Sequence, residues 1–309
     1  MTKKTTKNPE DYIYPLNING LEGRMLRLPP PKGKQREILF VYGQHSTLER
    51  WWGLVEEFNK FGGVTMADLP GFGGMTSFYK IGQSASLDNL AGYLATFIKL
   101  KYHRKKITIA GMSLAFAVVT RMLQLYPELT KNVEYLISIV GLAHHEDFVF
   151  NKRRKLIYRT GSWIFLHKWP SIFFKHVFLQ PAYLKRVYHR SANAKEKFKN
   201  ISGDEFQRTM NTELHLWKVN DIRTQMKTNY EMMTLNNCTK RVDLPVLHVA
   251  SKKDRYFDNV KVEEHMRRIF NDFSIFYTSS PNHAPTIIAT AEDAAPFIPP
   301  ALRRLLNKD

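Results

Sequence analysis

Residues 106–123 read KITIAGMSLAFAVVTRML and decide the fold of this chain. The first five residues form an apolar, β-branched run that predicts a buried strand, and residues 116–123 predict a helix. Between them stands Gly111-Met112-Ser113-Leu114-Ala115. Small residues on both sides of a serine let a strand and a helix approach closely at a strained turn. Such a turn would lift the serine hydroxyl clear of the sheet and aim the first helical N–H groups at the same spot.

A serine between small residues also occurs as a simple helix cap, so this motif alone leaves both roles open for Ser113. Four other segments accompany it, each a predicted strand that runs into a turn. The turns carry glycine, proline or a chemically active side chain. These segments are residues 38–45, 64–74, 244–254 and 273–283. Asp254 ends the third segment and His283 ends the fourth, so the chain order is serine, aspartate, histidine.

Together these five segments resemble the α/β-hydrolase superfamily, in its capped esterase- and lipase-like branch. The resemblance covers nearly the whole chain outside residues 145–235. It implies an α/β fold with a mostly parallel central sheet, helices on both faces and an inserted helical cap. The alternation of predicted strands and helices independently favours a mostly parallel sheet that is covered on both sides.

The resemblance also implies a role for each member of the motif. Ser113 would be the nucleophile, His283 the general base, and Asp254 the acid that orients the histidine. Asp258 is the second candidate for the acid, because Lys252 and Lys253 could make Asp254 an ordinary surface residue. Asp147, which follows an earlier strand, is a third and more remote candidate.

The family's oxyanion hole consists of two backbone N–H groups, and its positions correspond here to Gln44 and Leu114. The sequence departs from the family pattern at two nearby positions. Tyr42 stands where histidine is common, and Ala115 replaces the more common final glycine of the turn. Neither family residue is catalytic, so the expected chemistry is unaffected. Asp68, within the sequence Asp-Leu-Pro-Gly-Phe-Gly, is expected to support a turn.

Residues 1–144 and 236–309 are expected to form the hydrolase core, with residues 1–10 disordered. Residues 145–235 contain no convincing strand and are expected to form the helical cap. Outside this segment, the first two strands are expected within 12–28, and further strands at 38–42, 64–67, 107–110, 133–140, 244–250 and 273–277. Helices are expected at 48–61, 86–102, 114–126, 260–270 and from Pro285 onward, with Thr47 capping the first.

The charge of the chain is strongly positive, with a net +18 and a sequence pI near 9.8. Between Asn151 and Arg241 there are 19 Lys/Arg and 6 Asp/Glu residues, so most of the excess lies in one segment. Such a segment could attract an anionic membrane, a nucleic acid or an anionic substrate, or it could be a solvated surface. No recognised motif supports nucleic acid as the partner.

Other sequence features restrict the location and the cofactors. Cys238 is the only cysteine, so a disulfide framework within one chain is impossible and a cytoplasmic setting is favoured. The first ten residues lack the apolar run of a signal peptide, and residues 163–179 carry too much charge for a membrane span. We find no nucleotide-binding loop, and His144 with His145 lacks a third ligand in the sequence. No cofactor and no metal are therefore expected.

The aromatic stretch at residues 163–174 is the best sequence guide to the substrate. As the roof of a pocket it would suit an acyl chain; with its cations it would also suit a membrane surface. A third reading is that these aromatics pack the cap onto the core. The expected activity is hydrolysis of a hydrophobic, monoglyceride- or lysophospholipid-like ester through an acyl-enzyme. Lactones, thioesters, amides, C–C bonds and a catalytically idle binding protein remain alternatives.

Overall fold

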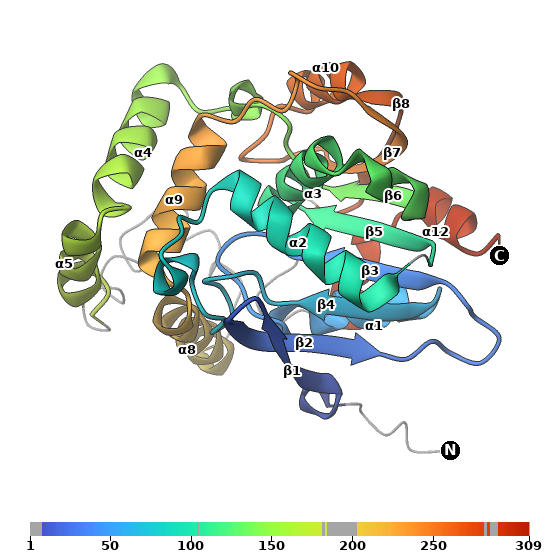
Figure 1. Ribbon diagram of the computed structural model, residues 1–309, viewed down its shortest axis with the longest axis horizontal. Helices are drawn as coiled ribbons and strands as arrows, with labels where there is room; N and C mark the ends of the chain where they lie inside the picture. The colour runs from blue at the N-terminus through green and yellow to red at the C-terminus, as the bar shows by residue number, and fades with distance from the viewer. Residues whose placement is uncertain are drawn as a thin grey trace.

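A computed structural model describes residues 8–103, 105–180, 183, 203–280, 283–284 and 290–308. Its centre is an eight-stranded sheet with the strand order β1-β2-β4-β3-β5-β6-β7-β8 (Figure 1). The strands are β1 (Ile13–Ile18), β2 (Leu21–Leu28), β3 (Glu37–Val41), β4 (Gly63–Ala67), β5 (Ile107–Met112), β6 (Val133–Ile139), β7 (Val242–Ser251) and β8 (Phe270–Thr278). β2 pairs antiparallel with both β1 and β4, and every other pair is parallel.

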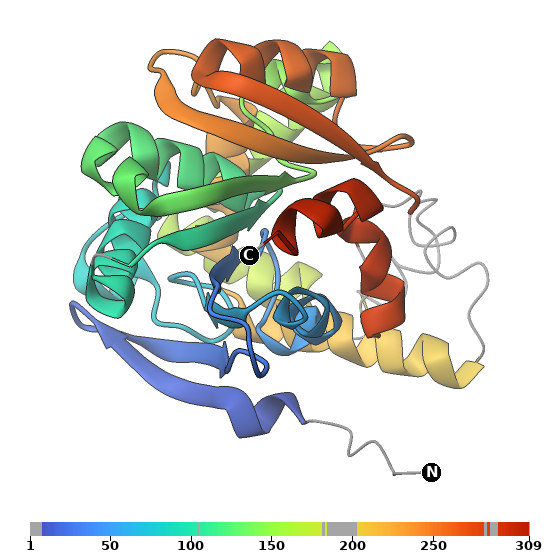
Figure 2. The same cartoon turned by 90° about the vertical axis from the view of Figure 1, so that its right-hand side faces the viewer.

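Helices cover both faces of this sheet. Figure 1 shows α2 and α3 in front of the sheet and α1 and α12 behind it, and Figure 2 shows the same layers from the side. The helices are α1 (Trp52–Asn59), α2 (Leu87–Tyr102), α3 (Leu114–Leu125), α4 (Lys152–Phe165), α5 (Lys168–Phe178), α8 (Gly203–Val219), α9 (Ile222–Met233), α10 (Asn259–Ile269), α11 (Ala291–Ala294) and α12 (Pro300–Leu306). The predicted fold class is therefore confirmed.

The central strands have the composition that this double coverage requires. Every residue of β4 and β5 is buried, as are the last four residues of β3. A strand buried on both faces needs a continuous apolar run rather than alternation, and the sequence has such runs here. Some of the helices begin at a residue whose side chain caps them. At the start of α2, for example, the Ser86 hydroxyl accepts a hydrogen bond from the backbone N–H of Asn89.

Three predicted boundaries differ from the structure. The helix expected over residues 48–61 is a 3-10 turn, Glu49–Trp51, followed by α1, and Thr47 does not occupy the N-cap position. Residues 1–7 of the tail predicted to be disordered lie outside the described residues, but Pro9–Tyr12 form a 3-10 turn. Of the closing helix, residues 285–289 also lie outside the described part, and α11 and α12 follow, divided near the predicted prolines.

The described part of the chain between β6 and β7 holds α4, α5, α8 and α9 and no strand. Figure 1 shows α9 next to the core and α4 and α5 on its outer side. No helix within the described residues is both long and apolar enough to cross a membrane. The helical character predicted for residues 145–235 agrees with these elements, while the predicted domain boundaries stay a prediction.

Candidate active site

Ser113 occupies the turn between β5 and α3 with a backbone that few residues adopt. Its φ is 52° and its ψ is −123°, a conformation that costs a non-glycine residue about 1–3 kcal/mol. The turn is tight because α3 begins directly against the strand. A Cβ atom on Gly111 would lie 2.9 Å from the Cα of Phe116. Glycine at position 111 is thus required for α3 to lie this close to β5. The packing of this strand and helix keeps the Ser113 backbone in its strained conformation.

Asp254 and His283 approach Ser113 from the ends of β7 and β8, two adjacent strands that β6 separates from β5. Asp254 follows β7, and His283 follows β8. The Nε2 atom of His283 lies 3.2 Å from the Oγ of Ser113, and its Nδ1 lies 2.7 Å from the Oδ2 of Asp254. The structure therefore brings the three residues predicted from the sequence into one hydrogen-bonded chain. In this chain the histidine can accept the serine proton while the carboxylate binds its other N–H.

The surroundings of Asp254 favour its charged form. Burial raises the pKa of Asp254, but the hydrogen bond and charge of His283 and the backbone N–H groups of Tyr256 and Phe257 together lower the pKa below its ordinary value. Those two N–H groups donate to Oδ1. The carboxylate is thus fixed on both oxygens, one by the loop and one by His283. This arrangement sets both the rotation and the tautomer of the imidazole.

The two alternative acids have other partners. Asp258 is the N-cap residue of α10, where its carboxylate accepts the N–H of Val260. Asp147 is fully buried, and its Oδ1 lies 2.5 Å from the Nδ1 of His265 on α10. Its other oxygen accepts the backbone N–H groups of Ala143 and of the next residue. Both carboxylates hold local structure, and no contact with His283 is found for either.

The predicted oxyanion donors lie at the same edge of the sheet as Ser113. β3 and β5 are parallel neighbours, so the loop after β3 and the turn after β5 emerge side by side. A Cβ on Gly43 would lie 3.3 Å from the Cβ of Ser113, which shows how close the two loops are. Within the described residues, the backbone N–H groups of Gln44 and Leu114 donate to no acceptor. Both donors are therefore free to bind an oxygen next to the serine.

Comparison with solved structures agrees with this architecture. A thermophilic esterase from Thermogutta terrifontis superposes with a TM-score of 0.62 at 16% identity, over 96% of this chain and 97% of that one. A bacterial membrane phospholipase A gives 0.65 at 14% identity, over 96% and 87%. An epoxide hydrolase from Bacillus megaterium gives 0.61 at 15% identity, over 87% and 93%. This chain has the α/β-hydrolase fold. No protein-family model and no curated protein matches its sequence.

In this α/β-hydrolase fold the loop after β3 is bound to α9. The side-chain amide of Gln44 donates to the carbonyl of Gln225 at 2.8 Å and to the hydroxyl of Thr228 at 2.7 Å. His45, in a left-handed conformation with φ 56°, lies 2.8 Å from the Oε1 of Gln225 through its Nδ1. Its ring also packs against Trp217 of α8. The helical segment therefore contacts the loop that carries a predicted oxyanion donor, a link that no local sequence signal indicates.

Asp68 organises a second buried network behind the β3 loop. The hydroxyl of Tyr42, which stands at the family's histidine position, donates to Oδ1 of Asp68 at 2.6 Å, and Arg24 donates to Oδ2 at 3.2 Å. Burial raises the pKa of Asp68 to about 7, against the opposing effects of Tyr42 and Arg24. Gly73 has a φ of 61°, and a Cβ there would lie 1.9 Å from the carboxylate. These contacts agree with the structural role expected for Asp68.

The histidine pair after β6 has more neighbours than the sequence suggested. His265 of α10 and Glu146 join His144, and one ligand-capable atom from each residue lies within 4.8 Å of the others. Sequence reasoning found no third ligand, because His265 is distant along the chain. Tetrahedral zinc holds its nitrogen and oxygen ligands only about 3.3 Å apart, since each bond is about 2.0 Å long. The Nδ1 of His265 is bound to Asp147, and its Nε2 lies 3.9 Å from the Oε2 of Glu146.

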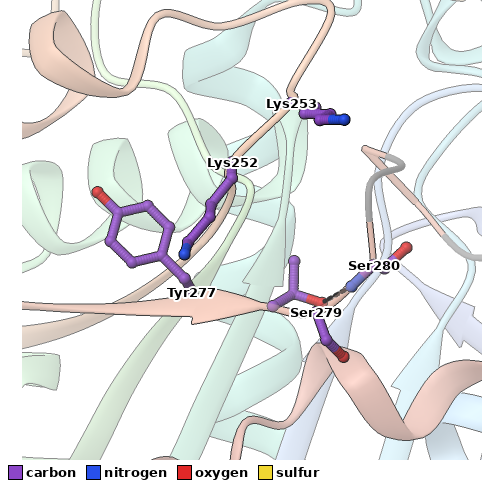
Figure 3. Close-up of a pocket in the computed structure, with 6 residues that line it drawn as sticks. Lys252, Lys253, Tyr277, Ser279 and Ser280 are labelled. Atoms are coloured by element: carbon purple, nitrogen blue, oxygen red, sulfur yellow. Dashed lines mark hydrogen bonds between the residues drawn. The ribbon is translucent and has the colours of Figure 1, made fainter.

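A shallow hollow of about 530 Å³ lies at the ends of β7 and β8 (Figure 3). Its lining consists of Lys252, Lys253, Tyr277, Thr278, Ser279 and Ser280. Within it the Thr278 hydroxyl accepts the backbone N–H of Ser280 at 3.0 Å. None of the three residues of the hydrogen-bonded chain lines this hollow, although Asp254 and His283 follow the same two strands. The hollow is therefore not the space that the serine hydroxyl faces.

The aromatic stretch at residues 163–174 is interpreted from the sequence as a pocket roof, as a membrane-binding surface or as packing between cap and core. Its exposure does not fit the first or the third. Trp163, Trp169 and Phe173 each expose more than half of their side chain. Phe165 and Phe174 are half-buried and contact each other, with ring centroids 4.8 Å apart. Most of the stretch thus neither joins the core nor encloses a pocket. The sequence could not show this, because a stretch that is apolar on all sides gives no indication of which face is covered.

Proposed function

We propose that this protein is a serine hydrolase that cleaves a carboxylic ester of a hydrophobic acyl substrate. The observation that carries the proposal is the hydrogen-bonded chain from Ser113 Oγ through His283 to Asp254, placed on a strained turn. A serine that only caps a helix needs neither a histidine within hydrogen-bonding distance nor a carboxylate behind that histidine. The three positions together are the requirement for an activated nucleophile.

The reaction follows from these positions. His283 Nε2 takes the proton of Ser113 as Oγ bonds to the ester carbonyl carbon, and the carbonyl oxygen becomes an oxyanion. The backbone N–H groups of Gln44 and Leu114 hold that oxyanion. When the intermediate collapses, His283 gives the proton to the leaving alcohol and an acyl-enzyme remains. Water then donates a proton to His283 and attacks the acyl carbon, after which the acid leaves and Ser113 regains its proton. No cofactor is required.

We assign residues 145–235 as the helical cap of this site. The support is the contact between α9 and the β3 loop, in which Gln225 and Thr228 bind the side chain of Gln44. A further hydrogen bond joins Ser77 to Thr224 of the same helix. The cap would therefore set the position of one oxyanion donor as well as the access of substrate.

The choice of a hydrophobic acyl ester has two supports. The first is the exposed apolar surface of α4 and α5, which suits a protein that works next to lipid. The second is the range of enzymes with this fold, which includes an esterase and a phospholipase A. The fold alone does not fix the bond that is cleaved, and the epoxide hydrolase shows its breadth. Given the single cysteine, we propose a cytoplasmic location.

The test is hydrolysis of p-nitrophenyl esters whose acyl chains run from short to long, with Ser113→Ala beside the wild type. We expect turnover by the wild type, an optimum at medium or long chains, and loss of turnover in the variant. A preference for short chains would reject the lipid-like substrate and keep the hydrolase. If no ester is turned over, esters are excluded as the substrate class. Lactones, thioesters, amides and activated C–C bonds are then the substrates to assay.

A further inference from the structure

The two helices that follow β6 present apolar side chains to solvent in an unusual way. Among the residues of α4 and α5, the only fully buried side chains are two serines, Ser162 and Ser171. In contrast, Trp169 is 75% exposed, Ile157 is 70% exposed and Phe173 is 57% exposed. Isolated apolar residues are common on protein surfaces, but a contiguous group of large ones marks an interaction site.

The exposed apolar residues are concentrated here rather than spread over the molecule. Of the eighteen large apolar side chains exposed in the described part of the chain, nine lie between residues 156 and 177. They are Leu156, Ile157, Tyr158, Trp163, Ile164, Trp169, Ile172, Phe173 and Val177. We call the outer surface of α4 and α5 that these residues form the docking face.

The docking face is also strongly cationic. Residues 152–178 contain seven Lys/Arg and no Asp or Glu. They are Lys152, Arg153, Arg154, Lys155, Arg159, Lys168 and Lys175. Within the part of the chain that the structure describes, none of the seven forms an ion pair with a carboxylate. Lys155 donates a hydrogen bond to the carbonyl of His145, before α4, and the charges of the other six are available to an external anion.

We propose that the docking face binds membranes that contain anionic lipids. Exposed aromatic and aliphatic side chains gain free energy when they enter the boundary between headgroups and acyl chains. Each Lys or Arg near an anionic surface adds to the attraction. A membrane satisfies both properties of the face at once, because it offers hydrocarbon and negative charge within a few ångströms of each other.

Two other partners fit less well. A nucleic acid would match the charge and could stack on tryptophan, but it offers no apolar surface to Leu156, Ile157 or Ile172. A second copy of this chain, docked face to face, would bring two sets of seven unpaired cations together, and like charges across an interface are unfavourable. The combination of aliphatic side chains with cations thus favours a lipid surface.

The face is connected to the candidate active site through α9. Arg223 of α9 donates a hydrogen bond to the carbonyl of Leu166, at the junction of α4 and α5. Gln225 and Thr228, which bind Gln44, lie on the roughly opposite side of the same helix, because successive residues turn by about 100°. Docking at the membrane would therefore involve a segment whose other side contacts the β3 loop.

The test is flotation of the protein with vesicles of phosphatidylcholine, with and without phosphatidylglycerol. Ser113→Ala is used as the background so that no lipid is consumed, which makes docking measurable whether or not the protein is a hydrolase. We expect flotation only with the anionic vesicles. The double variants Ile157→Ser/Trp169→Ser and Arg153→Glu/Arg159→Glu should each lower the partition coefficient by about tenfold or more.

Matched controls change equally exposed residues elsewhere. Leu100→Ser/Val260→Ser removes two apolar side chains from α2 and α10, and Lys101→Glu/Lys105→Glu reverses two charges near the end of α2. The apolar control should bind like the background protein, and the charge control should lose clearly less affinity than its partner variant. Equal losses in face and control variants, or no binding to anionic vesicles, would overturn the proposal. A stable dimer that buries this face would also overturn it.

Discussion

At the scale of single residues, the decisive uncertainty in the sequence was which carboxylate orients the histidine. Asp254 and Asp258 are only four positions apart, and two lysines precede Asp254. The structure separates them by their partners, since Asp254 contacts His283 and Asp258 starts α10. Local sequence cannot distinguish them because both lie in the same loop. The distinction depends on the position of His283, which follows β8.

We expect Asp254→Asn to lower kcat by about 10⁴, because the amide would hold the wrong tautomer of His283. Asp258→Asn serves as the matched control, since asparagine caps a helix nearly as well as aspartate does. Its kcat should stay close to that of the wild type. Steady-state kinetics on one ester measures both. Similar losses in the two variants would contradict the assignment of Asp254.

A second prediction concerns the pH dependence of stability. The pKa of Asp68 is about 7 in the folded protein and near 3.8 in an ordinary environment. Between these values the folded state holds a proton that the unfolded state releases. The contribution of Asp68 to the free energy of unfolding is therefore fully present below about pH 4. It is lost as the pH rises to about 7. The full effect is at most about 4 kcal/mol.

Asp68→Asn removes this titration and keeps a side chain that can still accept a hydrogen bond from Tyr42. We expect the free energy of unfolding of the wild type, relative to that of the variant, to decrease from pH 4 to pH 7. Urea unfolding at several pH values in this range measures the difference. A difference that stays constant, or one that increases with pH, would show that Asp68 is ionised throughout.

At the scale of elements, the sequence predicts the strands and the serine turn well and the contacts between distant elements poorly. The apolar run of β5 and the small residues around Ser113 are local signals, so they can be read directly. The hydrogen bond between Gln44 and Thr228 joins residues 184 positions apart, and it depends on how α9 packs. His144 and His265 come together in the same way, from the end of β6 and from α10. No periodicity in the sequence encodes such pairs.

The contact between α9 and the β3 loop leads to a prediction about catalysis. Thr228→Val keeps the buried volume but removes an acceptor from the side-chain amide of Gln44. We expect kcat to fall about tenfold with little change in KM, because the loss of about one hydrogen bond loosens the donor that acts mainly in the transition state. Thr212→Val on α8 is the control, since its hydroxyl is exposed and bonds only its own helix. Equal effects of the two substitutions would contradict the positioning role.

At the scale of the whole molecule, the strand order explains why these residues meet. β3 and β5 are neighbours although β4 comes between them in the chain, so the connections leave β3 in opposite directions. Crevices in parallel sheets form at the carboxyl ends of strands at such a reversal. Gln44 and Ser113 follow these two strands, and the ends of β7 and β8 add the acid and the histidine. The fold therefore assembles the site from loops that are far apart in sequence.

The central claim is that Ser113 is an activated nucleophile, and covalent trapping tests it most directly. An alkyl fluorophosphonate is added to the wild type, to Ser113→Ala and to His283→Ala, and intact mass with peptide mapping locates the adduct. We expect one adduct on Ser113 in the wild type, none in Ser113→Ala, and much slower labelling in His283→Ala, because the histidine must remove the serine proton. An unlabelled wild type, or equal labelling rates with and without His283, would contradict the account and indicate an idle scaffold.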